Sequence, residues 1–423
     1  MPPHHVSDPF GMVLICQSHC VYEDGIGRLP VIPKDWALHA THSAGEWVEQ
    51  QFLAHVAERL LVDPPPELDV ETMLSCGQLA LLMAEAYRHT IKLDIDIIRY
   101  NEALSKRESG MNDAQEHALL AKFPPSEKIM LRHPAVVLDS GYRIILWYIL
   151  DALAPWAQND MFKATTAMGD LLKKSIVHRS GLGWRTHKSN FRPVDTKGLS
   201  PGCINITPCW FQQGHECYGP LPEDPDDGFK PEVSAMLKGE RSLEMIIDIQ
   251  RPALLASVAL RVMHPQLYWA SLRTHVELGR WSAQQGLHDM HRLLKHWASV
   301  YTGAAVMCNR DFPCHQDPKC LPKAFDILTC IGSYQHAIMH LTNLGINLAY
   351  NPGVMVSYSG RLVRHGIRVN EGDQIVWAWF MRDSMHNYAR TPCPDYAGYN
   401  PADLDACILA KYNQADFMVY GTL

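Results

Sequence analysis

The part of the sequence best suited to chemistry is a short polar stretch, "NRDFPCHQDPKC", which runs from Asn309 to Cys320. Its centre holds His315 and Asp317, an imidazole and a carboxylate that are separated by one residue. In an extended chain, residues i and i+2 point to the same side, so this pair could bind one metal ion at the end of a strand. An ordinary polar loop could hold the same residues, and the downstream sequence has to decide between the two interpretations.

One further imidazole would complete the two-histidine, one-carboxylate triad of non-haem Fe(II) oxygenases, which leaves three metal positions open. The best candidate is His365, in "SGRLVRHGIRV", because the 48 positions from Asp317 to His365 accommodate about four strands. That length suits half of a double-stranded β-helix, or jelly roll. Another His-X-acid pair, His275 and Glu277, lies in a stretch with helical spacing, where i and i+2 point about 200° apart.

The open metal positions then need a cosubstrate. The ketoacid end of 2-oxoglutarate would chelate the iron, and its distal carboxylate would need a bidentate cation, which Arg offers and Lys does not. Arg382 lies 17 residues after His365, at the end of "QIVWAWFMR". Strand alternation places it on one face with Ala378, whose small side chain would leave room for a ligand. The ordered set of His-X-Asp, His and Arg therefore predicts an Fe(II)/2-oxoglutarate oxygenase that uses O2.

Other histidines and cysteines offer weaker alternatives. His336 and His340, or His288 and His291, could be ligands of another site, although isolated pairs of this kind are more often surface or core residues. A structural zinc site is a further alternative, because four residues of suitable type lie close together in the chain, at a spacing that fits no strong zinc pattern. These four are Cys203, Cys209, His215 and Cys217.

The composition favours a folded protein of two or three domains, because the chain has 423 residues and 47% of them are apolar. The longest apolar run, 144–150, is far shorter than the roughly 20 residues of a membrane span. The first residues lack the basic and apolar regions of a signal peptide. We therefore expect no membrane association, and we expect the twelve cysteines to be reduced thiols.

The formal net charge of −7 argues against non-specific nucleic-acid binding by the whole chain, but one segment is strongly basic. Residues 173–197 hold seven Lys or Arg, one acid and two aromatic residues. A solvated basic loop would have this composition, and so would a surface that follows a nucleic-acid strand and stacks on its bases. On the second interpretation, four cations line a groove that leads to the iron, and Trp184 lies near the displaced helix or the flipped base. The four cations are Arg179, Arg185, Lys188 and Arg192.

If cations of this segment contact DNA phosphates, neutralising Arg185 and Lys188 together is expected to weaken DNA binding. The same change should reduce its salt dependence, since each phosphate contact releases counterions. Binding of the metal and of 2-oxoglutarate is expected to stay unchanged.

The hydrophobic pattern predicts an α+β fold in which helices precede a β domain. Helical spacing covers 44–61, 70–89, 94–107 and 242–299, and the nearly all-apolar stretch 141–153 is expected to be a buried helix. We predict a helical N-terminal region at 1–160 and a catalytic domain at 161–423. The parts of the latter are a basic, irregular DNA-contacting segment (161–240), supporting helices (241–300), a double-stranded β-helix core (301–395) and a C-terminal tail (396–423).

Four stretches between 297 and 390 resemble the TET/JBP family of 2-oxoglutarate dioxygenases, and in particular its basidiomycete fungal branch. They are "NRDFPCHQD", "FDILTCIGSY", "LAYNPGVMVSYSGRLVRHGIRV" and "IVWAWFMRDSMH". The basic segment and "SPGCINITPCWFQQGHE" are also similar to the fungal branch. The N-terminal third carries no general motif of the family.

The resemblance implies Fe(II) at His315, Asp317 and His365, and a salt bridge from Arg382 to the distal carboxylate of 2-oxoglutarate. Arg310 matches a family arginine near the cosubstrate, and its neighbour Asn309 is expected to contribute to the same site. The family oxidises the methyl group of 5-methylcytosine in DNA stepwise to hydroxymethyl, formyl and carboxyl. At least one fungal relative is also associated with N6-methyladenine. The target base must flip out of the duplex to reach a buried iron.

The sequence departs from the family at the positions that contact the base. Several relatives carry Asn or Asp three residues after the ligand Asp, where this chain has Cys320. They often carry His eight residues after the cosubstrate Arg, where this chain has Arg390. His386 could substitute for that histidine, and Tyr388 could stack on the flipped base.

The favoured function is thus oxidation of methylated bases in double-stranded DNA by a nuclear, monomeric enzyme. An AlkB-like N6-methyladenine demethylase, a catalytically inactive DNA-binding protein with the same fold, and a hydroxylase of small molecules or proteins are the alternatives. A broken triad or a missing arginine would indicate the inactive protein, and the sequence shows neither. A hydroxylase of other substrates would leave the basic segment 173–197 without a role.

Overall fold

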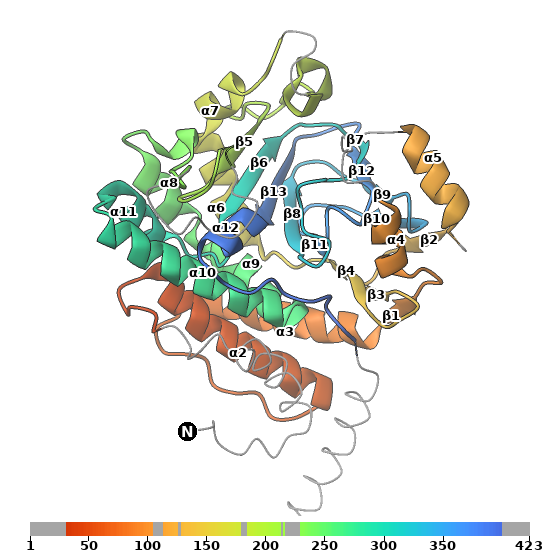
Figure 1. The fold of residues 1–423 in the computed structure, drawn as a ribbon, viewed down its shortest axis with the longest axis horizontal. Helices are drawn as coiled ribbons and strands as arrows, with labels where there is room; N and C mark the ends of the chain where they lie inside the picture. Colours follow the sequence, from red (N-terminus) through yellow and green to blue (C-terminus); the bar gives the residue numbers. More distant parts are fainter. Residues whose placement is uncertain are drawn as a thin grey trace, which may run out of the picture.

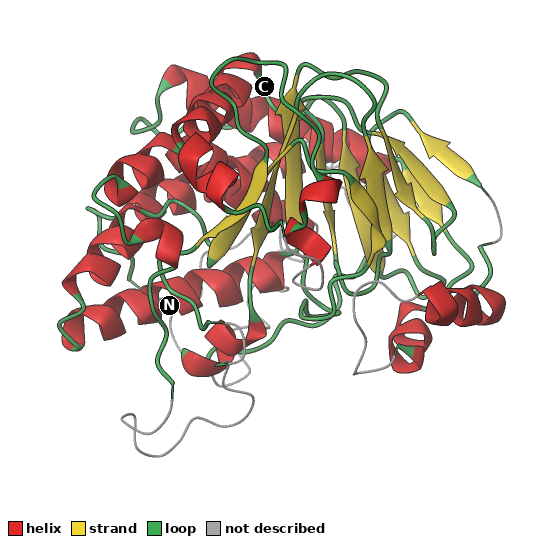
Figure 2. Ribbon diagram, turned by 90° about the horizontal axis from the view of Figure 1, so that it is seen from above, coloured by secondary structure: helices red, strands yellow, loops and turns green. Residues whose placement is uncertain are grey.

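The structure is a computed structural model that describes residues 31–104, 113–125, 128–178, 184–212, 215 and 229–399. Arg179, Cys217 and nearly all of the predicted C-terminal tail lie outside these residues. Over the described ranges the chain has an α+β fold, in which helices cover one face of a large sheet and a smaller sheet lies on the other side (Figures 1 and 2). In the part of the chain that the structure describes, every helix is too short or too polar to span a membrane.

The helices largely follow the predicted pattern, and local signals set where they begin. Helix α3, for example, begins at Val70, where the carboxylate of the preceding Asp69 accepts a hydrogen bond from the backbone amide of Thr72 at 2.9 Å. The described helices are α2 (Ala37–Ala57), α3 (Val70–Arg88), α4 (Ile97–Ala103), α5 (Asp113–Lys122), α6 (Pro155–Ala167), α7 (Gly169–Lys174), α8 (Ser242–Asp248), α9 (Gln250–Met263), α10 (Pro265–Gln284), α11 (His288–His296) and α12 (Asp383–Tyr388), with short 3-10 turns η1 (Trp184–Thr186), η2 (Lys188–Asn190) and η3 (Ala235–Leu237).

Two sheets are formed by the described residues. The larger has the strand order β1 (Thr90–Lys92), β3 (Ala135–Leu138), β4 (Ile144–Ile149), β11 (Met355–Tyr358), β8 (Asp326–Gly332), β13 (Gln374–Phe380), β6 (Gly303–Cys308) and β5 (Gly202–Ile206). The smaller has the order β2 (Ile129–Leu131), β10 (Ile346–Ala349), β9 (Ile338–Leu341), β12 (His365–Arg368) and β7 (Phe312–His315).

The prediction of a buried helix at 141–153 is wrong, because its central residues form strand β4. This strand pairs antiparallel with β11 and β3 inside the larger sheet. All six of its residues are buried, so it has no polar face to produce the alternation of a half-exposed strand. A short strand covered on both faces has a continuous apolar sequence that periodicity cannot distinguish from a buried helix. The region predicted to be helical thus adds β1, β3 and β4 to the larger sheet and β2 to the smaller. The domain boundary at residue 160 stays a prediction.

Strand β13 shows how the two faces of the larger sheet divide the core. Trp377 and Trp379 belong to the apolar cluster on the helical side. Val376 and Ala378 pack with the second cluster, between the two sheets. This alternation follows from the pleat of the strand and agrees with the face predicted for Ala378. The strand therefore fixes the direction of the chain just before Arg382.

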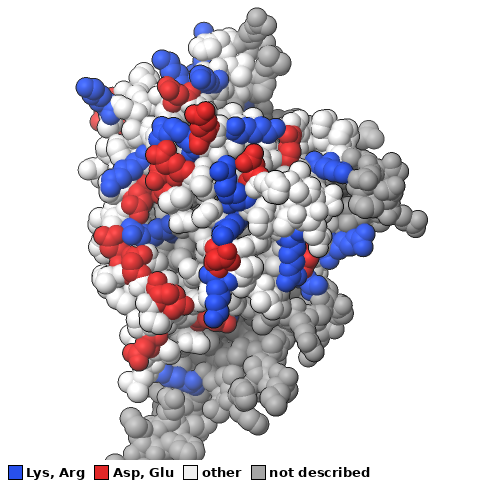
Figure 3. Space-filling view, turned by 90° about the vertical axis from the view of Figure 1, so that its left-hand side faces the viewer, with Lys and Arg blue, Asp and Glu red and all other residues white. Residues whose placement is uncertain are grey.

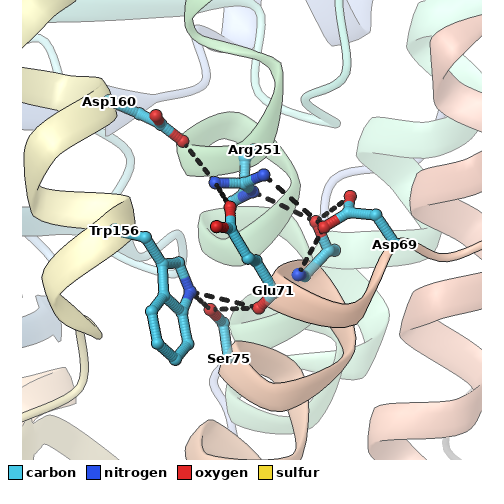
Figure 4. A network of polar contacts seen from close by, with 7 residues as sticks. Asp69, Glu71, Ser75, Trp156, Asp160 and Arg251 are labelled. Atoms are coloured by element: carbon cyan, nitrogen blue, oxygen red, sulfur yellow. Dashed lines mark hydrogen bonds and ion pairs between the residues drawn. The ribbon is translucent and has the colours of Figure 1, made fainter.

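An ion-pair network joins three helices behind the larger sheet (Figure 4). Arg251 of α9 places Nη1 2.8 Å from Glu71 of α3 and 2.7 Å from Asp160 of α6. Nearby, the indole of Trp156 donates to Ser75 Oγ at 2.6 Å. These contacts tie the N-terminal helix α3 to α6 and α9, which pack behind the larger sheet.

The pairing of β7 with β12 is tight at a glycine beside the candidate site. A Cβ atom added at Gly366 would lie 2.8 Å from the backbone nitrogen of Cys314 on the neighbouring strand. The two strands carry His315 and His365 in direct register. The absence of a side chain at Gly366 therefore permits the separation at which these histidines face each other.

We predict that Gly366→Ala lowers the free energy of unfolding by roughly 1–3 kcal/mol, because the added methyl group overpacks backbone atoms that cannot rotate away. Metal binding should weaken as well, since the strands must separate. Gly239→Ala is the matched control, because nothing lies within 4 Å of a Cβ at that position. Denaturant titration and metal titration of both variants measure these effects, and equal stability of the two would contradict the prediction.

Candidate metal centre

Three predicted ligands converge in the structure. The candidate ligand atoms of His315, Asp317 and His365 all lie within 4.8 Å of one another. Asp317 Oδ1 is 4.0 Å from Nε2 of His315, and Asp317 Oδ2 is 3.9 Å from Nε2 of His365. His315 ends β7 and His365 begins β12, so the extended chain brings all three to one side.

Both imidazoles are oriented for metal binding by the chain itself. Nδ1 of His315 lies 2.8 Å from the carbonyl oxygen of Pro313, and Nδ1 of His365 lies 3.1 Å from that of Val363. A carbonyl oxygen can only accept, so each Nδ1 carries the proton and each Nε2 presents a lone pair. This arrangement, in which the second ring nitrogen donates to the backbone, is typical of histidine ligands.

The protonation states also suit a cation. Burial, together with the charge that a protonated His365 would carry, lowers the pKa of His315 to about 3. Burial likewise lowers the pKa of His365. Although burial alone would raise the pKa of Asp317, the two imidazoles and Arg185 hold it well below its usual value. At neutral pH the site therefore offers two neutral imidazoles and one carboxylate, the forms that bind metal.

The backbone at Gly360 makes room for the carboxylate ligand. The Asp317 amide donates to the Gly360 carbonyl at 2.8 Å. A Cβ at Gly360 would lie 3.1 Å from Asp317 Oδ2, so a side chain there would crowd the ligand. The loop after β11 thus sets the position of the carboxylate.

Gln316, between the two ligands of the His-X-Asp pair, links their loop to the one that leads to His365. Its Nε2 donates to the Arg361 carbonyl at 3.0 Å and lies 3.3 Å from the hydroxyl of Tyr100 on α4. A single amide therefore holds the loops of all three ligands against an N-terminal helix. The sequence analysis gave this residue no role.

Arg382 follows β13 and lies in the same region as the triad. Its Nη1 is 3.7 Å from the sulfur of Cys320, and its guanidinium lies 4.7 Å from the ring centre of Phe380. Burial lowers its pKa, but nearby Cys320 and Asp326 outweigh this and hold the pKa above the usual value. The half-buried guanidinium thus keeps its positive charge, as a partner for a carboxylate needs to.

Asp326, which the sequence analysis missed, is a second carboxylate in this cluster. Its Oδ2 accepts a hydrogen bond from the thiol of Cys320 at 3.1 Å. Burial raises the pKa of Asp326 to about 7, against the opposing effects of Cys320 and Arg382. The feature of the sequence that could have indicated Asp326 is an acidic residue at the start of the apolar strand β8, "DILTCIG". Cys320, predicted to face the base, is therefore engaged with both Arg382 and Asp326.

Of the two other predicted cosubstrate residues, Arg310 lies near the site and Asn309 has another role. Arg310 is only 4% exposed, and burial lowers its pKa, with Cys203, Arg185 and Asp317 among its charged or polar neighbours. The amide nitrogen of Asn309 instead donates to Pro193 and Asp373, at 2.6 and 2.7 Å. Its side-chain oxygen accepts from the Gln374 amide at 2.7 Å. The prediction for Asn309 is corrected, because these contacts engage both ends of its amide in joining strands.

The basic segment is divided between the site and the scaffold. Nη2 of Arg185 donates to Asp317 Oδ1 at 2.7 Å, so this residue touches a metal ligand. Arg192 donates to the Gly372 carbonyl at 3.1 Å and lies 3.5 Å from Asp311, which makes it part of the scaffold. Lys188 is exposed. For Trp184 the structure gives the backbone position in η1, and DNA contact by this segment stays a prediction.

The expectation that neutralising Arg185 leaves metal binding unchanged stays a prediction, but the reason given for it does not hold. That expectation assumed that the basic segment lies apart from the β domain, whereas Arg185 reaches a carboxylate 132 positions along the chain. On one further face of the described structure the charges are mixed. Figure 3 shows the face that includes α8 and α11, where the described Lys and Arg side chains are interspersed with Asp and Glu. That face presents no patch of one sign.

The residues predicted to contact the base after Arg382 lie against α10. His386 is fully buried, and its Nδ1 lies 3.0 Å from Thr274 Oγ1. Tyr388 packs its ring edge-on against Trp281 at a centroid distance of 5.2 Å. The full burial of His386 disagrees with the substrate role predicted for it, whereas the role of the half-buried Tyr388 stays a prediction. Arg390 is exposed, and its role stays a prediction.

The zinc alternative gains no support from the described residues, where His315, Asp317 and His365 form the cluster able to hold an ion. Cys209 is buried, and burial raises the pKa of its thiol, which opposes the thiolate that zinc requires. The ring of His215 stacks on Phe229 at 4.0 Å.

Comparison with known proteins adds little to this geometry. No protein-family model matches the chain, and no curated protein matches it by sequence. Among solved structures, the chain is similar to NgTET1 in complex with 5mC DNA, at 14% sequence identity and a TM-score of 0.39. The similarity covers 66% of this chain and 87% of that chain. At so low a TM-score it supports no conclusion about this protein.

We predict that Gln316→Ala weakens binding of a divalent metal by about 10- to 100-fold, the usual effect of removing a residue that orients ligands. The fold should persist, because the residue is only half-buried. Isothermal titration with Mn(II) measures the change, with Gln284→Ala, an exposed position on α10, as control. Equal affinities in the two variants would mean that the loops hold their positions without this amide.

Proposed function

We propose that this protein is an Fe(II)- and 2-oxoglutarate-dependent DNA dioxygenase of the TET/JBP type, built on a double-stranded β-helix. The observation that carries the proposal is the convergence of two neutral imidazoles and a carboxylate within 4.8 Å of one another, near a half-buried arginine that keeps its charge. This ligand set is the facial triad of non-haem Fe(II) oxygenases. The triad lies at the edge of the smaller of two sheets, and this arrangement is consistent with the proposed fold.

His315, Asp317 and His365 would hold the iron, and Arg382 would pair with the distal carboxylate of 2-oxoglutarate. When bound, Fe(II) with 2-oxoglutarate and O2 supplies the oxidising power to hydroxylate a methyl group, and 2-oxoglutarate is converted to succinate and carbon dioxide. The half-buried cation of Arg382 would orient the cosubstrate, and the buried Arg310, which lies near Asp317, would assist.

The proposed substrate is 5-methylcytosine in double-stranded DNA, oxidised stepwise to the hydroxymethyl, formyl and carboxyl forms after base flipping. The resemblance of four stretches of sequence to the TET/JBP family, closest to its fungal branch, supports this choice. The exposed Lys188 and the half-exposed Arg185 would meet the phosphates in a monomeric, nuclear enzyme.

N6-methyladenine is the second candidate substrate, and one observation favours considering it. At the position where relatives carry a cytosine-contacting Asn or Asp, Cys320 instead donates a hydrogen bond to Asp326. The base would then meet different polar groups. Hydroxylation of a nitrogen-bound methyl group gives a hemiaminal that releases formaldehyde, whereas a carbon-bound methyl group leaves a stable alcohol.

A DNA-binding protein without catalysis is the alternative from another class. Such a protein would have no need of the triad or of Arg382. The convergence of all three ligands, each in the protonation state that binds metal, argues against it.

We predict that the protein, supplied with Fe(II), 2-oxoglutarate and air, converts 5-methylcytosine in a duplex to its oxidised forms, as measured by mass spectrometry of nucleosides. Asp317→Ala should abolish the products, because Asp317 is the only anionic residue of the three candidate ligands. Asp289→Ala, which removes an exposed acid on α11, should retain them. Formaldehyde from an N6-methyladenine duplex would select the demethylase, and metal binding without oxidation of either base would contradict a dioxygenase of these bases.

We predict that Arg382→Ala raises the KM for 2-oxoglutarate by on the order of 30- to 1000-fold, the equivalent of losing roughly 2–4 kcal/mol from a desolvated charge pair. Arg382→Lys should restore little, because an ammonium group cannot form the planar two-bond contact. Steady-state kinetics with varied 2-oxoglutarate measure both variants. An unchanged KM in Arg382→Ala would transfer the role to another residue, with Arg310 the first to test.

A further inference from the structure

One cation of the basic segment makes direct contact with the carboxylate ligand. Arg185, in the short turn η1, donates from Nη2 to Asp317 Oδ1 at 2.7 Å. The Arg185 side chain is 41% exposed and that of Asp317 is 32% exposed, so water screens part of the attraction. Even a weak hydrogen bond from Arg185 distinguishes the two oxygens of the Asp317 carboxylate, because it engages Oδ1 in particular.

The two oxygens of Asp317 are therefore not equivalent. Oδ1 accepts the hydrogen bond from Arg185, whereas Oδ2 lies 3.9 Å from Nε2 of His365 and beside Gly360. The backbone amide of Asp317, held by the Gly360 carbonyl, prevents the carboxylate from shifting as a whole. A metal ion between the imidazoles would thus meet Oδ2 with its lone pairs available and Oδ1 with a guanidinium already attached.

We propose that Arg185 keeps Asp317 a monodentate ligand, so that three metal positions stay open for the cosubstrate and oxygen. The inference rests on the proposed function. In a six-coordinate site, three protein atoms leave three positions, two for a chelating ketoacid and one for oxygen. A bidentate carboxylate would occupy a fourth position, and chelation and oxygen binding would then compete. Arg185 acts through Asp317 and is a positioning residue.

This role makes a prediction that general structural support would not make. Replacing Arg185 with Met removes a cation near the metal and releases Oδ1, so metal affinity should stay equal or increase. The affinity of the metal-loaded protein for 2-oxoglutarate should fall by about tenfold or more. The reason is that the released Oδ1 of Asp317 would occupy one of the metal positions that 2-oxoglutarate and oxygen need. A residue that merely stabilises the fold would weaken both affinities together.

The experiment uses the full chain loaded with Mn(II), whose exchangeable inner-sphere waters are counted from the relaxation of water protons. We expect about three waters in the wild type and about two in Arg185→Met. Arg241→Met is the matched control, because it removes another Arg–carboxylate pair, with Glu244, at an exposed position. That control should keep the wild-type water count and both affinities.

Three outcomes would overturn either the role proposed for Arg185 or the metal centre on which that role depends. The same water count in Arg185→Met and wild type would refute the monodentate role even if 2-oxoglutarate binds more weakly, and would leave the metal centre standing. Parallel loss of metal and 2-oxoglutarate affinity would assign Arg185 to the scaffold. Failure of the wild type to bind Mn(II), or binding that survives Asp317→Ala, would instead refute the metal centre on which the proposed function depends.

Discussion

Two short strands at the edge of the smaller sheet hold the candidate metal centre together, because β7 ends and β12 begins at directly paired histidines. That pairing fixes the separation of the imidazoles, and the close approach at Gly366 permits it. Asp317 follows His315 by two residues and places its carboxylate beside both imidazoles. A metal bound here would link the two strands, so that metal affinity and the local stability of this edge are coupled.

The charges around the triad form the second level of organisation. Guanidinium groups of Arg185, Arg310 and Arg382 surround the carboxylates of Asp317 and Asp326. Before any ion binds, cations exceed anions in this cluster, which would favour the binding of an anionic ligand. The arrangement also divides the roles, since Arg185 holds a ligand oxygen while Arg382 lies beside Cys320 with its charge retained. Electrostatics thus complement the geometry that the strands provide.

The helical layer contributes by fixing the larger sheet and the loops. Trp377 and Trp379 of β13 pack toward the helices, which sets the direction of the chain before Arg382. On the other side, Tyr100 of α4 contacts Gln316 between two ligands. The N-terminal part of the chain is therefore structurally continuous with the site, through strand β4 as well as through α4.

The sequence alone determined the triad, the position of Arg382 at the end of a strand and the α+β fold, because those depend on local spacing and on the period of strands and helices. It misassigned β4, whose two buried faces remove the alternation. The contact of Arg185 with Asp317, the amide of Asn309 between strands and the turn of His386 toward α10 were decided by tertiary structure. Such contacts join residues more than 60 positions apart, and no local pattern encodes which polar group a folded neighbour will present.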